Sequence, residues 1–154
     1  MRIGAHVPTR GGILSAIPAA RERAAQAVQV FVSNPRAWAP PRAFERDAEA
    51  FREAWAASGL GPLLVHAPYL VNVASPNEDF LARSRALLAR TVRACDAYGA
   101  LALVVHAGAG GPQEPDAARA RAAGVLRAVC EEAEETTVAV ELMAGTAGAV
   151  ASTI

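Results

Sequence analysis

Five short apolar runs, separated by longer polar and alanine-rich stretches, constrain the fold of this chain most strongly. The runs are RIGAHV (2–7), AVQVFV (27–32), LLVHAP (63–68), ALVVHA (102–107) and VAVEL (138–142). Apolar residues occupy nearly every position in them, a pattern typical of strands that are buried on both faces. The sequence therefore predicts five short strands.

The stretches between these runs have the periodicity of helices. They cover residues 13–25, 42–58, 77–98 and 115–134. Apolar residues recur in them at helical spacing, as in Phe44, Phe51 and Trp55 of the second stretch. Proline precedes the second and third stretches, and Gly59 and Gly99 follow them, where a helix C-cap favours glycine. Four helices are predicted.

The strict alternation of strand and helix indicates an α/β fold with a parallel sheet, because parallel neighbours need a crossover that a helix supplies. Two topologies remain open at this point, an open doubly wound sheet and a (β/α)8 barrel. With 154 residues the chain fits a single domain, 1–154.

Composition excludes some classes of function. The formal net charge is zero, so the chain lacks the strong overall positive charge of many nucleic-acid binders. Cys95 and Cys130 lie far apart in the sequence and predict neither a metal knuckle nor a redox pair. The first residues run directly into a strand-like segment, without a leader pattern, and no stretch resembles a membrane span. We expect a cytoplasmic protein that does not enter membranes.

Candidate metal ligands fall at the ends of four predicted strands. His6, His66, His106 and Glu141 lie near the ends of the first, third, fourth and fifth runs, and the sequence contains no other histidine. A lone histidine in an apolar run is commonly a hydrogen-bonded core residue. Here, however, reactive residues of such folds gather at the carboxyl ends of strands, and neighbouring strands lie ~4.8 Å apart. His66, His106 and Glu141 therefore form a candidate zinc site, and His6 is the weaker candidate.

Several strings of the sequence resemble one family in order and spacing. They are IGAH near the start, FVSNPRAW (31–38), HAPYLVN (66–72), VVHAG (104–108) and VELMAG (140–145). Together they resemble the N-terminal half of bacterial endonuclease IV, and the H-x-P-Y-L-x-N pattern is the most specific of them. Members of that family are zinc-dependent enzymes that cut DNA at abasic sites, built on a xylose isomerase-like TIM barrel.

The resemblance implies roles for individual residues. It makes His66 and His106 ligands of one zinc, and Glu141 the catalytic carboxylate that bridges this zinc to a second. It places Arg36, Tyr69 and Leu70 on loops that enter damaged double-stranded DNA at the abasic site. Apolar groups wedged into the base stack help to expose a target nucleotide.

The length of the chain suggests an incomplete barrel. A (β/α)8 barrel needs about 250 residues, whereas this sequence ends after its fifth predicted strand. We therefore expect about five strands and four helices, one near-complete site of a multi-zinc centre, and no activity of the chain alone. Under this hypothesis the expected protein partner is a complementary C-terminal half-barrel chain.

Two other interpretations stay open. One is a sugar isomerase or epimerase of the same barrel superfamily, which also takes metal ligands from strand ends; HAPYLVN and SNPRAW argue against it, because neither string is expected in a small-sugar pocket. The other is a non-catalytic fragment or one half of a split barrel.

Overall fold

The computed structural model describes residues 1–111, 115–143 and 148–151. Its elements are, in chain order, β1 (Gly4–His6), the 3-10 turn η1 (Ile13–Ser15), α1 (Ala16–Glu22), β2 (Ala27–Val30), α2 (Phe44–Ser58), β3 (Leu63–His66), α3 (Glu78–Tyr98), β4 (Ala102–His106), α4 (Pro115–Glu132) and β5 (Thr137–Glu141). The predicted α/β class, with five strands and four helices, is confirmed.

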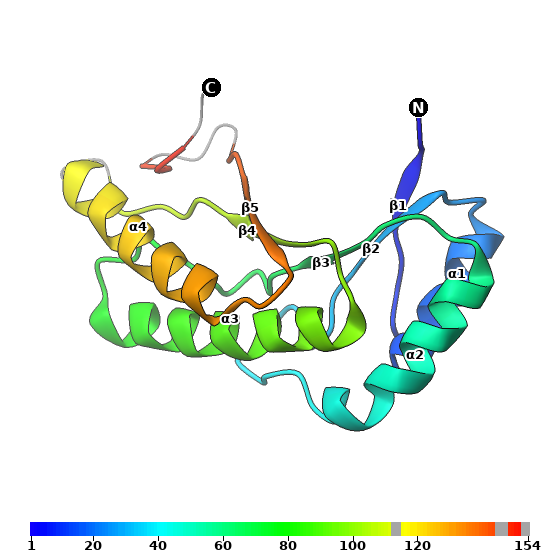
Figure 1. The fold of residues 1–154 in the computed structure, drawn as a ribbon. Coiled ribbons are helices and arrows are strands. Elements are labelled where there is room, and N and C mark those ends of the chain that lie inside the picture. The colour runs from blue at the N-terminus through cyan, green and yellow to red at the C-terminus, as the bar shows by residue number, and fades with distance from the viewer. Residues whose placement is uncertain (112–114, 144–147, 152–154) are drawn as a thin grey trace.

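The strands form one parallel sheet in the order β1-β2-β3-β4-β5. The helices lie along the outer side of this curved sheet (Figure 1). A doubly wound sheet reverses its strand order at a switch point and carries helices on both faces. Because the order here is consecutive, the doubly wound alternative is wrong, and the sheet has the strand order of part of a (β/α)8 barrel.

The strand and helix boundaries differ slightly from the predicted ones. The first four predicted strands are present but shorter, and the fifth is shifted by one residue. The predicted first helix divides into η1 and α1 and ends at Glu22, before Ala24, which has a left-handed φ of 50°. An L-residue with a left-handed φ cannot continue a right-handed helix. Helix α1 therefore ends before the apolar pattern of the sequence does.

The predicted C-cap glycines are confirmed, and α3 also has a side-chain N-cap that the sequence analysis did not name. Asn77 caps α3 by accepting a hydrogen bond from the backbone N–H of Phe80 at 2.9 Å. Gly59 and Gly99 end α2 and α3 in the left-handed region, with φ of 70° and 69°. Among the described residues, no helix combines the length and the apolar character that crossing a bilayer requires.

The core lies between the sheet and the helices. The strand residues that point outward, towards the helices, are fully buried in this core; examples are Val28, Val65 and Val105. Their inward-facing neighbours Gln29 and Leu64 are only half-buried. This alternation shows that the helix-covered face supplies the hydrophobic stability, whereas the inner face of the sheet is open.

Asp96 organises the end of the sheet at which the strands begin. Its carboxylate accepts hydrogen bonds from the backbone N–H groups of Glu134 (3.0 Å), Glu135 (3.1 Å) and Thr136 (2.8 Å), which form the loop before β5. Burial alone would raise the pKa of Asp96, but the interaction with the Thr136 side chain and these backbone hydrogen bonds outweigh it and hold the pKa below its ordinary value. Asp96 therefore fixes the approach of β5 to the sheet.

The two edge strands of the described sheet are β1 and β5. On β5, Val140 is 47% exposed, and Leu142, just after the strand, is 42% exposed. Apolar side chains beside unpaired strand edges favour association with other chains. The edges are thus the least protected part of the sheet.

Candidate metal centre

His66, His106 and Glu141 end three neighbouring strands, and the structure brings their side chains together. His106 lies directly opposite Glu141 in the β4–β5 register. The Nε2 atoms of His66 and His106 lie 3.2 Å and 3.7 Å from Oε2 of Glu141. One ligand atom from each of the three residues lies within 4.8 Å of the other two. Residues 144–145, the end of the VELMAG string, lie outside the described part of the chain.

The hydrogen bond of His66 determines which of its nitrogens is free. Nδ1 lies 2.6 Å from the carbonyl oxygen of Ala67. A carbonyl oxygen only accepts, so Nδ1 carries the proton, and Nε2 of the neutral ring keeps its lone pair. This lone pair faces Oε2 of Glu141, which is itself an acceptor. Two acceptors at this distance are stabilised by a cation or by a proton placed between them.

The three side chains offer donor atoms of the kind that bind metal ions. Two imidazole nitrogens and one carboxylate oxygen form a ligand set known from catalytic zinc sites. His66 is buried, which orients its ring, whereas the side chains of His106 and Glu141 are 34% and 49% exposed. The exposed side leaves room for water or substrate beside an ion.

His6 does not belong to the group of three. Its ring centroid lies 6.2 Å from that of His66, and its Nδ1 is 3.2 Å from Nε2 of Gln29 on the neighbouring strand. Partial burial, followed by repulsion from His66, lowers the pKa of His6. The ring is therefore favoured in its neutral form.

An asparagine that the sequence analysis did not single out holds two loops of the site together. The side chain of Asn72, at the end of HAPYLVN, donates to the carbonyl oxygen of Ala109 (2.8 Å) and accepts from the backbone N–H groups of Ala109 and Ala74 (both 3.1 Å). Gly108 has φ of 79°, and a Cβ there would lie 2.6 Å from Oδ1 of Asn72. Only glycine fits beside this clamp, which keeps the loops after β3 and β4 in place.

The predicted DNA-contacting residues lie on the loops after β2 and β3. The backbone N–H of Tyr69 donates to the carbonyl oxygen of Pro35 at 2.9 Å, which ties the two loops together. Tyr69 is 56% exposed, and its ring packs edge-on against Phe31 at 5.1 Å. Arg36 is exposed and Leu70 is half-buried. All three residues come after the carboxyl end of a strand, so they lie at the same end of the sheet as the candidate metal ligands.

A hollow of about 670 Å³ opens between the loops after β1 and β2. Its lining includes Arg10, Phe31 and Asn34. The hydroxyl of Thr9 donates to the carbonyl oxygen of Phe31 at 2.8 Å and joins the two loops. A polar, partly cationic hollow of this kind suits an anionic ligand, and Phe31 connects it to the ring of His66 at 5.4 Å.

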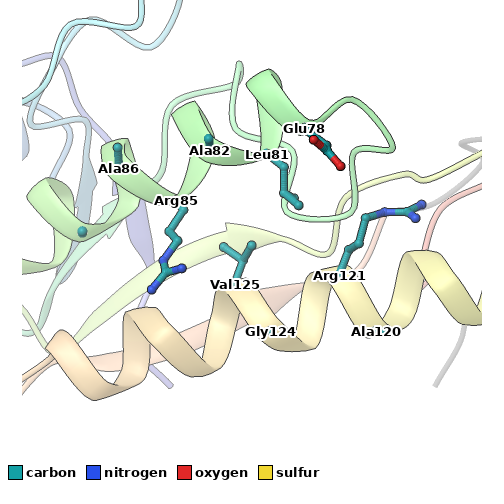
Figure 2. Close-up of a pocket in the computed structure, with 10 residues that line it drawn as sticks. Glu78, Leu81, Ala82, Arg85, Ala86, Ala120, Arg121, Gly124 and Val125 are labelled. Atoms are coloured by element: carbon teal, nitrogen blue, oxygen red, sulfur yellow. The ribbon is translucent and has the colours of Figure 1, made fainter.

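A second hollow, of about 730 Å³, lies on the helical side of the molecule between α3 and α4. Figure 2 shows Leu81 and Val125 facing each other across it, with Arg85 and Arg121 on either side. Its lining is mostly apolar and contains none of the strand-end residues. It is a groove between two helices, separate from the candidate metal centre.

Comparisons with known proteins agree with this geometry. The family model described as xylose isomerase-like TIM barrel matches residues 17–154. A probable endonuclease 4 of Streptomyces coelicolor is 47% identical over 116 residues, which cover 73% of this chain and 39% of that protein. The crystal structure of endonuclease IV from Thermus thermophilus matches with a TM-score of 0.82 and 30% identity, over 97% of this chain and 55% of that one.

A 3-keto-D-glucoside 4-epimerase from E. coli shares the fold, with a TM-score of 0.66 and 18% identity over 93% of this chain and 56% of its own. Identity this low shows the fold alone. The chain spans about half the length of these relatives or less. By its fold, its family model and its relatives, this chain belongs to the xylose isomerase-like TIM barrel family and is similar, within it, to endonuclease IV.

Proposed function

We propose that this chain is the N-terminal part of a zinc-dependent, endonuclease IV-like phosphodiesterase that cleaves DNA at abasic sites and acts in the cytoplasm. The convergence of His66, His106 and Glu141 carries the proposal. In particular, the lone pair of His66 Nε2 faces the Glu141 carboxylate, an arrangement that suits a shared cation.

His66 and His106 would hold one zinc, and Glu141 would bridge it to a second. Bound zinc would neutralise charge on a phosphodiester and make hydroxide available near neutral pH. The carbonyl oxygen of Ala67 would keep the His66 ring in the ligating tautomer, because it holds the proton on Nδ1. The Asn72 clamp would keep the loops after β3 and β4 at a fixed separation around the ligands.

The loops after β2 and β3 would recognise the lesion. Tyr69 offers an exposed aromatic ring that Phe31 supports from one side. Leu70 adds an apolar group, and Arg36 adds a cation for the phosphate backbone. Because the Tyr69 N–H binds Pro35, these groups would enter the duplex as one unit.

Residues 1–154 alone would not cleave DNA. Among the described residues, only three metal ligands converge, and Glu141 as a bridging group needs a second ion with ligands of its own. The open edges at β1 and β5 are where further strands of a barrel would pair. A complementary half-barrel, in the same polypeptide or as a second chain, would supply both.

The test is a chimera in which residues 1–154 replace the matching half of the Thermus thermophilus endonuclease IV. We expect zinc-dependent cleavage of an abasic-site duplex by the chimera, no cleavage of intact duplex, and none by residues 1–154 alone. Glu141→Gln should abolish cleavage. A folded, zinc-loaded chimera that leaves the abasic duplex uncut would refute the proposal.

A matched pair of variants in the chimera tests the role of Tyr69. Tyr69→Ala should weaken binding to abasic duplex by about tenfold, on the order of one lost stacking contact, and binding to intact duplex much less. Tyr69→Phe keeps the ring and should bind like the parent. Equal losses on both duplexes would assign Tyr69 to loop packing.

A further inference from the structure

His6 is the one strand-end histidine to which the proposed function gives no role. It ends β1 and lies opposite Gln29 of β2 in the register. Both side chains line a hollow of about 230 Å³ on the inner face of the sheet, together with Leu64 of β3. The His6 ring packs against Phe31 at 4.5 Å, which orients it beside His66.

The contact with Gln29 fixes the tautomer of His6. In the structure the side-chain amide nitrogen of Gln29 lies 3.2 Å from Nδ1 of His6, and because an amide nitrogen only donates, Nδ1 accepts in this orientation of the amide. In the neutral ring the proton is then on Nε2. Among the described residues, no hydrogen-bond acceptor contacts this Nε2–H group, nor does a donor contact the side-chain amide oxygen of Gln29.

His6 and His66 are thus in opposite tautomers. Ala67 holds the proton of His66 on Nδ1 and leaves Nε2 as a lone-pair donor to a metal. With Gln29 donating to Nδ1, the proton of His6 is on Nε2, so the nitrogen left free is a hydrogen-bond donor rather than a lone-pair donor. Two rings 6.2 Å apart can therefore contact the same bound oxygen in different ways.

We propose that His6 is a substrate-binding residue whose Nε2–H donates a hydrogen bond to an anionic phosphate oxygen held beside the His66–His106–Glu141 centre. The assignment rests on the proposed function, because the metal centre is what would bring a phosphate there. Gln29 acts as a positioning residue, since its side-chain amide contacts His6 and sets the tautomer of that ring.

Three substitutions of His6 in the full 154-residue chain separate a donor from a ligand. His6→Gln places an amide N–H near the position of Nε2, His6→Asn places its amide near Nδ1, and His6→Phe removes both. Zinc affinity would be measured by competition with a chelator, and binding of inorganic phosphate to the zinc-loaded chain by 31P NMR. His66→Ala is the control for loss of a ligand.

We expect all three variants to bind zinc like the wild type, whereas His66→Ala does not. Phosphate binding should fall by about tenfold in His6→Asn and His6→Phe, the effect of one hydrogen bond to a charged group, and should be retained in His6→Gln. A loss of zinc affinity in the His6 variants, or equal phosphate binding in all three, overturns the assignment.

Long-range 1H–15N spectra of the histidine rings supply a readout that does not depend on zinc. In the metal-free chain His6 should carry its proton on Nε2 and His66 on Nδ1. If the wild type binds no zinc, the proposed metal centre fails, and the spectra still test the His6 assignment. A proton on Nδ1 of His6 would overturn it.

Discussion

Glu141 and Asp96 are acidic side chains at opposite ends of the same sheet, and their surroundings differ. Asp96 accepts three backbone N–H groups, so its charge is matched by donors within the chain. Glu141 faces His66 and His106, and the nitrogen that His66 presents to it has a lone pair when the ring is neutral. The Asp96 carboxylate is satisfied by backbone donors, whereas the half-exposed Glu141 carboxylate lies against two imidazole rings.

The difference agrees with how such barrels divide stability from chemistry. Residues at the ends where strands begin hold the structure together, and residues at their carboxyl ends carry the reaction. Asp96 should therefore affect folding without affecting metal binding, and Glu141 should do the opposite.

The largest expected effect is on zinc. His66→Ala or Glu141→Gln should lower zinc affinity by about a hundredfold or more, because each removes one of three ligands. Competition with a chelator measures the effect, and Glu131→Gln, a surface carboxylate on α4, is the control. Unchanged zinc affinity in both variants would leave Glu141 as an ordinary surface acid.

Next is the effect of Asp96 on stability. Asp96→Asn should lower the free energy of unfolding by about 1–2 kcal/mol, because hydrogen bonds to a charged acceptor are replaced by weaker ones. Urea denaturation followed by circular dichroism gives the value. Zinc affinity should match that of the wild type; a parallel loss would break the separation between the two ends of the sheet.

The contribution of Asp96 should also depend on pH. Its folded pKa lies below its ordinary value, so the unfolded chain takes up the proton first as the pH falls. The stabilisation is complete well above the ordinary value of about 3.9 and is lost as the pH falls through the folded pKa. Urea midpoints of wild type and Asp96→Asn should thus converge in acid, and a constant difference would contradict this.

The smallest effect concerns Glu141 in the absence of metal. Glu141→Gln should change the unfolding free energy of the zinc-free chain by less than about 0.5 kcal/mol, as is usual for exposed positions. Its amide can even donate to the lone pair of His66. Thermal melts with a chelator present measure this, and a destabilisation as large as that of Asp96→Asn would make Glu141 a structural residue.

The sequence was sufficient to predict the fold class and the positions of the candidate ligands. Buried parallel strands are nearly continuous apolar runs, so His66, His106 and Glu141 could be placed at strand ends from the pattern alone. Their convergence then followed from the spacing of neighbouring strands.

The Asn72 clamp, the Asp96 network and the tautomers of His6 and His66 could not be predicted in this way. Each depends on a contact between specific atoms, and several of these contacts join residues far apart in the sequence. Periodicity gives the face of a strand on which a side chain lies, but not the partner of each of its atoms.

The Asn72 clamp also bears on how this site could be transferred or could diverge. Asn72 ends the HAPYLVN string and Gly108 ends VVHAG, and the two fit each other within atomic contact. A side chain at position 108 would collide with the clamp unless position 72 changed as well. The two strings must therefore change together. A design that transfers one of them to another barrel has to transfer the other as well.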